Sequence, residues 1–434
     1  MGYDSFEKVD KSTKKKMEYG RESYLRQLIS RKHSRLIKIV SGIRRCGKSY
    51  LLNILFKKHL IETGVPEERV ISISLDDFEQ AKYRDPATLY NYVKESLRSD
   101  DMHYLLLDEV QMLGEFESVP NGLMRRPNLD IYVTGSNSRF LSTDVVTEFR
   151  GRGEEIRVYP LSFAEYAAAR PGVDWWQNWR EYSLYGGMPL VASYEDDAQK
   201  ENYLRSLMLE TYLKDIVERN KLQNFEALEE LVDMLASGIG GLTNASKLER
   251  RFKSEKGITL SAPTIRQYLD FMMDAFLVQK VARYDIKGKR YINTPCKYYF
   301  TDIGLRNARI NFRQPDMPHI MENIIYNELT IRGFCVDVGE VKILTPEREQ
   351  RSVEVDFVVN RGSNRYYIQS AWAMPSEEKR RQEIRPLQRI NDDFRKIVIV
   401  NDMMPSHQTE EGITIISLYD FLLNTEQMQR LFRF

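Results

Sequence analysis

The stretch VSGIRRCGKSYLLN, residues 40–53, contains the pattern that decides the fold of the first part of the chain. Its residues from Gly42 to Ser49 fit the spacing G-x-x-x-x-G-K-[ST] of a phosphate-binding loop. The β-branched run RLIKIVSG precedes the loop and the amphipathic run KSYLLNILFKKHL follows it, so we expect a buried strand, a turn and a helix in that order. Such a turn directs backbone N–H groups and the positive end of the helix dipole at a phosphate. The stretch therefore predicts a loop that binds the triphosphate of ATP.

Each position of the loop has an expected role. The glycines are needed because a side chain there would hold the backbone away from the phosphate oxygens. Lys48 is expected to reach the β- and γ-phosphates, and the Ser49 hydroxyl is expected to hold Mg²⁺. Two interpretations of the loop arginines stay open, a phosphate contact or charge balance with a neighbouring acid. The expected nucleotide contacts are Gly42, Ile43, Arg44, Arg45, Cys46, Gly47, Lys48, Ser49 and Tyr50.

Bulk composition limits the classes of protein that the chain can belong to. A chain of 434 residues should form about two to four domains. Its 64 Lys and Arg against 63 Asp and Glu argue against charge-driven wrapping of nucleic acid and leave only local basic patches open. The sequence contains neither an apolar run of about 18 residues nor a secretory leader, so no membrane partner is expected. Three scattered cysteines and five unpatterned histidines exclude a cysteine-based zinc site and predict a cytoplasmic protein.

Alternating strands and helices predict a parallel sheet over residues 21–165. After the first strand, the runs RVISISLDD, MHYLLLDEV, LDIYVTGSN and EEIRVYPLSF each have the composition of a buried strand. Such strands, alternating with helices, indicate a parallel sheet that is covered on both faces. Ligands of these sheets bind at the carboxyl ends of the strands. Gly42, Asp108 and Ser136 each end a predicted strand, so we expect them to meet in one crevice.

The run LLLDEV supplies the expected catalytic acids. Asp108 would hold Mg²⁺, and Glu109 would act as the general base that polarises the attacking water. Adjacent acids after an apolar strand can also be solvated turn residues, but the phosphate loop upstream favours catalysis. In VTGSN, Ser136 or Asn137 is expected to contact that water or a γ-phosphate oxygen, with a simple turn as the alternative.

Two arginines flank a glycine in the run EFRGRGEEI. Arg150 or Arg152 could reach across a subunit boundary as an arginine finger, in which case the protein is a homo-oligomer. The same residues could equally form a solubilising turn, and the sequence leaves both interpretations open.

The motifs occur in one order, namely the phosphate loop, LLLDEVQ, VTGSN, RGR followed by YPLSF, and YGGMP. In this order they resemble the prokaryotic AAA-class predicted ATPases whose C-terminal domain of unknown function is similar to restriction endonucleases. The resemblance extends over residues 20–434, and RGR, YPLSF and YGGMP are its most specific motifs. It implies a P-loop core with an additional strand, and it implies the roles given above for Lys48, Ser49, Asp108 and Glu109, with Ser136 or Asn137 as the sensor.

The rest of the chain divides into further predicted units. Residues 1–20 are a polar N-terminal segment, residues 166–224 a helical lid or linker, residues 225–312 a winged-helix domain and residues 316–434 a nuclease-like domain. The winged helix rests on SAPTIRQYLDFMMDAF, with Ser261 as N-cap, followed by a ribbon that turns at Gly288. Lys287, Lys289 and Arg290 in this ribbon could contact a DNA backbone, but the sequence does not favour DNA binding over protein docking and leaves both open.

The last domain is predicted to have lost its nuclease chemistry. Its helix MENIIYNEL carries acids, and the strand SVEVDFVV places Glu354 and Asp356 together. A nuclease of this kind also needs an acid-x-lysine on the next strand, where this chain has Gln369-Ser370-Ala371. Two lysines elsewhere show no suitable spacing, Lys342 and Lys379.

The predicted fold class is therefore α/β, a P-loop parallel sheet with helices on both faces, then a winged-helix segment and a restriction-endonuclease-like α/β domain. The predicted function is an ATP-hydrolysing, Mg²⁺-dependent switch that acts on its appended modules and on an unidentified protein partner. A nucleotide-gated DNA nuclease and a non-hydrolysing DNA-binding or docking regulator are the alternatives.

Overall fold

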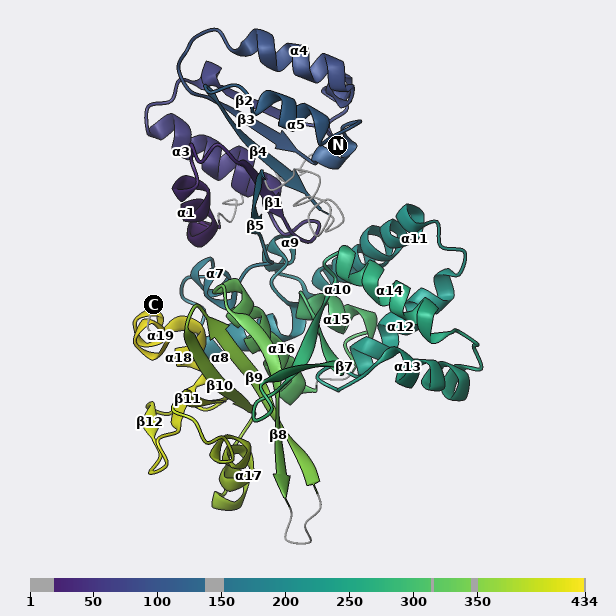
Figure 1. Ribbon diagram of the computed structural model, residues 1–434, viewed down its shortest axis with the longest axis vertical. Helices are drawn as coiled ribbons and strands as arrows, with labels where there is room; N and C mark the ends of the chain where they lie inside the picture. The colour runs from purple at the N-terminus through teal and green to yellow at the C-terminus, as the bar shows by residue number, and fades with distance from the viewer. Residues whose placement is uncertain (1–18, 137–151, 314–315, 345–349, 433–434) are drawn as a thin grey trace, which may run out of the picture.

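The structure is a computed structural model of the chain and describes residues 19–136, 152–313, 316–344 and 350–432. Its N-terminal part carries one sheet and its C-terminal part a second, larger sheet, with a group of helices beside the latter (Figure 1). The predicted α/β fold class is confirmed, because a parallel sheet with flanking helices is followed by a domain with a mixed sheet. Among the helices of the described residues, none is both long and apolar enough to cross a membrane.

The first sheet has five strands in the order β2-β3-β4-β1-β5, and every neighbouring pair is parallel. The strands are β1 (Ile37–Ser41), β2 (Val70–Ser74), β3 (His103–Asp108), β4 (Leu129–Gly135) and β5 (Gly153–Arg157). Strands β1, β3 and β4 are buried at every residue and β2 at three of its five residues, as their apolar composition predicts. Strand β4 lies between β1, which leads into the phosphate loop, and β3, which ends in the acids. This is the additional-strand order that the resemblance implies.

Helices cover both faces of this sheet. They are α1 (Glu22–Ser30), α2 (Lys48–Tyr50), the π-helical segment η1 (Leu51–Phe56), α3 (Lys57–Glu62), α4 (Pro86–Ser96) and α5 (Ser118–Leu123). Helices α1 and α3 lie on one side of the sheet, and α4 and α5 lie on the other (Figure 1). Helix α4 begins after Asp85, whose carboxylate accepts the Thr88 N–H at 2.8 Å, and Pro86 occupies its first position.

A helical region follows, built from α7 (Phe163–Ala168), α8 (Trp175–Tyr185), α9 (Pro189–Ala192), α10 (Asp197–Ser206), η6 (Leu207–Leu213), α11 (Lys214–Asn220), α12 (Phe225–Ser237), α13 (Ala245–Arg251), η7 (Phe252–Lys256) and α14 (Ala262–Asp274). Ser261 caps α14 by accepting the Thr264 N–H at 3.4 Å, as predicted. The stripe of Ile265, Leu269 and Met272 on α14 is buried, so this face of the helix belongs to the core.

The second sheet has eight strands in the order β12-β13-β11-β10-β9-β8-β6-β7. They are β6 (Val278–Asp285), β7 (Arg290–Phe300), β8 (Cys335–Leu344), β9 (Gln350–Arg361), β10 (Asn364–Ala371), β11 (Arg395–Val400), β12 (His407–Gln408) and β13 (Thr414–Ser417). The helices of this region are α15 (Ile303–Arg309), α16 (Met317–Ile331), α17 (Glu377–Gln388), α18 (Leu418–Leu423) and α19 (Thr425–Phe432).

The ribbon that was predicted to be a wing is the hairpin β6–β7, and it belongs to this second sheet. Strand β6 pairs in parallel with β8, with Arg283, Tyr284 and Asp285 opposite residues 338–340. The sheet thus runs across the boundary predicted at residues 312–316. At the hairpin turn, Lys287 donates to the Lys342 carbonyl at 3.1 Å. The hairpin is therefore not a free ribbon, although the division of the chain into domains stays a prediction.

Candidate functional site

The phosphate loop joins β1 to α2 through backbone conformations that need glycine. Gly42 has a φ of 144° and Gly47 a φ of 100°, both in the left-handed half of the Ramachandran plot. A Cβ atom on Gly42 would lie 2.1 Å from the carbonyl oxygen of Val158, so only glycine fits there. Lys48 is buried, and its Nζ donates to the carbonyls of Gly42 at 2.9 Å and Ile43 at 3.1 Å. The ammonium group thus lies inside the loop.

The loop leaves its backbone donors available. Within the described part of the chain, no intramolecular acceptor takes the N–H groups of Arg44, Arg45 and Gly47. The side chains of Ile43 and Cys46 are fully buried, so these two residues can face a ligand only with their backbone. A converging set of N–H groups beside a lysine fits a polyphosphate, as the sequence predicted.

Two side chains from distant segments brace the loop. The guanidinium of Arg21, just before α1, donates to the Cys46 carbonyl at 3.4 Å, contacts the Tyr159 carbonyl and pairs with Glu165 at 2.9 Å. From the other side, the Tyr212 hydroxyl of η6 donates to the Arg44 carbonyl at 2.8 Å. No local sequence pattern predicts either of these contacts. They connect the loop to the helical region that follows the sheet.

Asp108 ends β3 and lies beside the start of α2. The Asn53 amide donates to its carboxylate at 3.3 Å, and the Thr134 hydroxyl donates to the other oxygen. Burial raises the pKa of Asp108 above its usual value, although hydrogen bonds from Thr134 and Ser49 oppose the shift. The Ser49 hydroxyl and the Asp108 carboxylate are therefore neighbours, and they form the pair of oxygen ligands expected for Mg²⁺. This donor set fits the metal.

Glu109 follows with a left-handed backbone, at a φ of 52°. Its N–H donates to the Thr134 hydroxyl at 2.9 Å, which ties it to the end of β4. Its carboxylate accepts the Ser136 hydroxyl at 3.2 Å and contacts the Gln111 amide. A positive φ at a non-glycine residue is held in place by its surroundings and is common at functional sites. The structure thus brings Glu109 and Ser136 together, although they are 27 residues apart.

A cluster of charged side chains approaches this edge from α11. Asp215 pairs with Arg44 at 3.2 Å and with Arg219 at 3.0 Å. The Nε of Arg44 also donates to the Ser136 hydroxyl at 3.4 Å. Burial lowers the pKa of Arg219, while Asp215 and Glu109 oppose that shift. We call this group the arginine latch, defined by Arg44, Asp215 and Arg219; the sequence pattern pointed only to Arg44.

The other predicted site residues lie elsewhere. Asn137 and Arg150 fall outside the described residues. Arg152 is exposed at the amino end of β5, where its carbonyl accepts the Ile37 N–H at 2.9 Å. In its own chain it therefore lies at the sheet edge opposite the phosphate loop. Tyr50 is partly buried on the first helical turn after the loop.

A second polar cluster lies in the C-terminal sheet. Lys297 of β7 is buried and pairs with Glu322 of α16 at 2.7 Å and with Glu354 of β9 at 2.6 Å. The Tyr299 hydroxyl donates to Glu322 at 2.5 Å, and Asp356 accepts the Ser370 N–H at 2.7 Å. We call Lys297, Glu322, Glu354 and Asp356 the lysine–acid cluster.

Electrostatics within the lysine–acid cluster act in opposite senses on the charged forms of Lys297 and Asp356. Burial, with Glu322 nearby, raises the pKa of Asp356 well above its usual value despite the charge of Lys297. Burial alone would lower the pKa of Lys297, but Glu322, Asp356 and Glu354 together raise it. The lysines considered from the sequence lie elsewhere, because Lys342 pairs with Asp285 at 3.6 Å and Lys379 with Glu383 at 2.6 Å.

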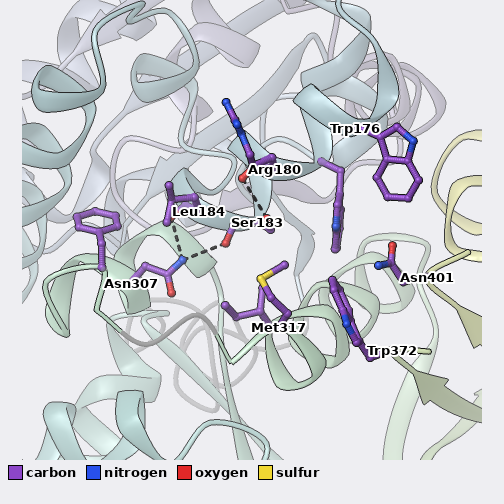
Figure 2. A pocket seen from close by; sticks show the side chains of 11 residues that line it. Trp176, Arg180, Ser183, Leu184, Asn307, Met317, Trp372 and Asn401 are labelled. Carbon is purple, nitrogen blue, oxygen red and sulfur yellow. Dashed lines mark hydrogen bonds between the residues drawn. The ribbon is translucent and has the colours of Figure 1, made fainter. Parts of the chain in front are cut away.

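An apolar cavity of about 510 Å³ lies between α8, α16 and the ends of β10 and β11. Figure 2 shows Trp176, Met317, Trp372 and Asn401 around it, with the Asn307 amide bonded to the α8 backbone at one side. None of its lining residues belongs to the nucleotide loop, the arginine latch or the lysine–acid cluster.

Comparisons with known proteins agree with this geometry. The AAA domain family matches residues 34–167, and a domain of unknown function (DUF8612) matches residues 177–316. An uncharacterized protein of Haemophilus influenzae is 34% identical over 410 residues, which cover 93% of this chain and 98% of that protein. The uncharacterized protein MJ1544 of Methanocaldococcus jannaschii is 25% identical over 390 residues, covering 84% of this chain and 82% of that protein.

Solved structures that are similar to parts of this chain include Cdc6p from Pyrobaculum aerophilum and AMPPCP-bound DnaA from Aquifex aeolicus. The first is 14% identical, covers 71% of this chain and 95% of its own, and has a TM-score of 0.30. The second is 16% identical, covers 59% of this chain and 88% of its own, and has a TM-score of 0.29.

The strand order, the phosphate loop and the acids at the end of β3 define an AAA-class P-loop protein. Within that class, the chain belongs to the same family as the Haemophilus influenzae protein, which it matches over nearly its full length.

Proposed function

We propose that the protein is a Mg²⁺-dependent ATPase that acts as a nucleotide switch. One observation carries this proposal: the carboxyl edge of the first sheet brings together Lys48, Asp108, Glu109 and Ser136 beside a loop with available backbone donors. These are the parts that phosphoryl transfer to water requires, namely a phosphate cradle, a metal ligand set and a positioned base.

Each residue has a defined task in this reaction. The N–H groups of the loop bind phosphate oxygens, and Lys48 exchanges its two carbonyl partners for the β- and γ-phosphates. Ser49 and Asp108 would hold Mg²⁺, which neutralises charge on the phosphate oxygens when bound. Glu109 takes a proton from the attacking water, and the Ser136 hydroxyl orients the Glu109 carboxylate at 3.2 Å.

The test is a Lys48→Ala variant in an ATP-binding assay with a fluorescent nucleotide. We expect loss of ATP binding, because the loop loses the only side-chain cation within it that lies among its carbonyls. Lys58→Ala is the matched control, since Lys58 is an exposed lysine ten residues further on that pairs only with Glu62 among the described residues. Unchanged affinity in Lys48→Ala would refute the assignment.

We also propose that Arg150 or Arg152 completes a neighbouring subunit's site as an arginine finger. The position of Arg152 at the far edge of its own sheet supports an action in trans over one in cis. Alanine at the finger should cut turnover about a thousandfold while ATP binding persists. Mixing this variant with Glu109→Gln should restore part of the activity, because one mixed interface pairs an intact base with an intact arginine. Turnover that is independent of protein concentration, without rescue, would indicate a monomer.

We also propose that the protein acts in the cytoplasm, and that its winged-helix segment and nuclease-like domain respond to whether ATP or ADP is bound. The C-terminal domain has a nuclease-like set of acids, but Lys297 lies among them and Gln369 accepts the Asp356 N–H at 3.4 Å. This arrangement supports a domain that binds DNA or a protein without cleaving DNA. A nucleotide-gated nuclease is the second candidate, and Mg²⁺-dependent nicking of a plasmid would favour it.

A further inference from the structure

A basic groove crosses the amino end of the first sheet, at the edge opposite the phosphate loop. It consists of two adjoining hollows of about 330 and 800 Å³ that share Met102, Arg126 and Pro127. Five permanently charged side chains line it, and they define the basic groove: Arg35, Lys94, Arg98, Arg125 and Arg126.

The fold itself brings these cations together. Residues 31–36, 97–102 and 124–128 are the segments that enter β1, β3 and β4, which are neighbours in the sheet. Hydrogen bonds join two of the segments, because the Asn128 amide donates to the Ser99 carbonyl at 2.9 Å and the His103 N–H donates to the Asn128 carbonyl at 2.8 Å. The groove is therefore built on the rigid edge of a buried sheet.

The groove carries an unbalanced positive charge. Within the described part of the chain, none of its five cations forms an ion pair. Two acids also line it, but Asp130 contacts Lys38 and accepts the Tyr132 hydroxyl at 2.9 Å and the His33 N–H at 3.0 Å. Asp100, which is exposed, is the one lining acid without such a partner in the described structure. Five cations thus face one unmatched carboxylate.

In the turn before β1, two residues that line the groove have an unfavourable backbone conformation. His33 has a φ of 62° and Arg35 a φ of 61°, in the left-handed region that is unfavourable for residues other than glycine. The ring of His33 donates to or accepts from the Tyr104 hydroxyl at 2.8 Å, which fixes this turn against β3.

We propose that the basic groove binds the phosphate backbone of a nucleic acid. Four of its five cations are arginines, whose planar fork matches phosphate oxygens in pairs. No Phe, Tyr or Trp of the described chain lines the groove, and the one lining ring, that of His33, is bonded to the Tyr104 hydroxyl, so the groove has no row of aromatic rings on which successive bases stack. The contact is therefore with the backbone and is independent of sequence. The chain's net charge of +1 makes this patch a local feature rather than a consequence of overall basicity.

The experiment measures binding of the full-length protein to a labelled 30-base-pair DNA duplex and to a single-stranded RNA, at 50 and 200 mM salt. Five phosphate contacts give a salt slope of about −4.5 on duplex DNA, so affinity should fall about 500-fold over this fourfold rise in salt. One double variant removes cations from the segments before β1 and β4, Arg35→Ala with Arg126→Ala, and the other removes cations from the last turn of α4 and the loop after it, Lys94→Ala with Arg98→Ala. Each should reduce the slope by about 2.

The matched control removes two cations from α3, outside the groove, Lys57→Ala with Lys58→Ala, which pair with Glu67 and Glu62. This variant should bind the duplex as the unmodified protein does, and all variants should retain ATP binding because the phosphate loop lies at the other edge. The proposal would be overturned if only the α3 variant lost nucleic-acid binding, if both groove variants bound the duplex as tightly as the unmodified protein, or if polyglutamate bound more tightly than DNA. Since the readout uses no nucleotide, failure of the ATPase assignment would leave this result unaffected.

Discussion

The arginine latch yields a prediction that tests how the site changes when ATP binds. Asp215 pairs with Arg44 at 3.2 Å and with Arg219 at 3.0 Å, and Arg44 also donates to Ser136 beside Glu109, the proposed general base. Both guanidinium groups lie on the side of the site where the γ-phosphate is expected. We therefore expect that binding ATP requires at least one arginine to leave Asp215, and that Asp215→Asn removes this competition.

The expected size follows from the burial of the pair. The Asp215 side chain is 17% exposed and that of Arg44 is 37% exposed, so the pair is partly buried. Such a pair contributes about 1 to 1.4 kcal/mol after desolvation and screening. Since 1.4 kcal/mol is a factor of ten in affinity, Asp215→Asn should tighten ATP binding about five- to tenfold. ADP lacks the γ-phosphate, so its affinity should change by less than about twofold.

Isothermal titration calorimetry of the unmodified protein and of Asp215→Asn measures the affinity of each for ATP and for ADP. Glu210→Gln is the matched control, because Glu210 lies one turn earlier and its recorded partner is the exposed Lys214 rather than the loop. Equal affinity changes for ATP and ADP would show that the variant acts through stability instead of the latch. Weaker ATP binding in Asp215→Asn would show that Asp215 positions the arginines for the nucleotide, and it would refute the competition argument.

Three further predictions concern Glu109, Asp302 and Lys297. Glu109→Gln should bind ATP normally while its turnover falls by about two to four orders of magnitude, measured by phosphate release. Burial raises the pKa of Asp302 to about 6, so the folded state holds a proton that the unfolded state releases near pH 4, and stability should fall as pH rises from about 4 to 6. In urea unfolding, the free energy of unfolding of the unmodified protein should fall by about 2 to 3 kcal/mol more between pH 4 and 7 than that of Asp302→Asn. An equal pH dependence in the two proteins would exclude this group as the cause. Lys297→Met leaves Glu322 and Glu354 unpaired and should destabilise the protein by about 3 to 5 kcal/mol, with partial recovery on adding Glu322→Gln; the absence of recovery would mean that Lys297 acts by packing.

The parts of the site that the sequence could predict are those encoded by short, local patterns. The five strands are apolar runs bounded by polar turns, and the structure has a strand at each of them. The acids and Ser136 follow those strands directly. Parallel strands place their ends at one edge, so the meeting of Glu109 and Ser136 follows from counting residues.

The parts that escaped prediction depend on pairings across long separations. Tyr212 reaches the Arg44 carbonyl across 168 residues, and nothing in the run LMLETYLKDIVERN marks which side chains face the loop. The hairpin β6–β7 has the alternation of a solvent-exposed ribbon. Its parallel pairing with β8, about 50 residues on, leaves no local trace. Lys297 therefore looked like part of a wing, although it lies between two acids of the C-terminal domain.

The motif YGGMP, residues 185–189, lies close to both the phosphate loop and the start of α15. Gly187 donates its N–H to Asp302 at 2.7 Å, and a Cβ on Gly186 would lie 2.3 Å from the same carboxylate, so the motif must approach the start of α15 without side chains. Two residues later, the Cγ of Pro189 lies 3.9 Å from where a Cβ of Gly47 would be, so the motif also passes close to the phosphate loop. The buried Asp302 carboxylate accepts the N–H groups of Gly187 at 2.7 Å and of Leu305 at 3.0 Å, and it thereby ties the motif to the first turn of α15. We therefore expect a displacement of Gly187 to break a hydrogen bond of Asp302 unless α15 moves with it.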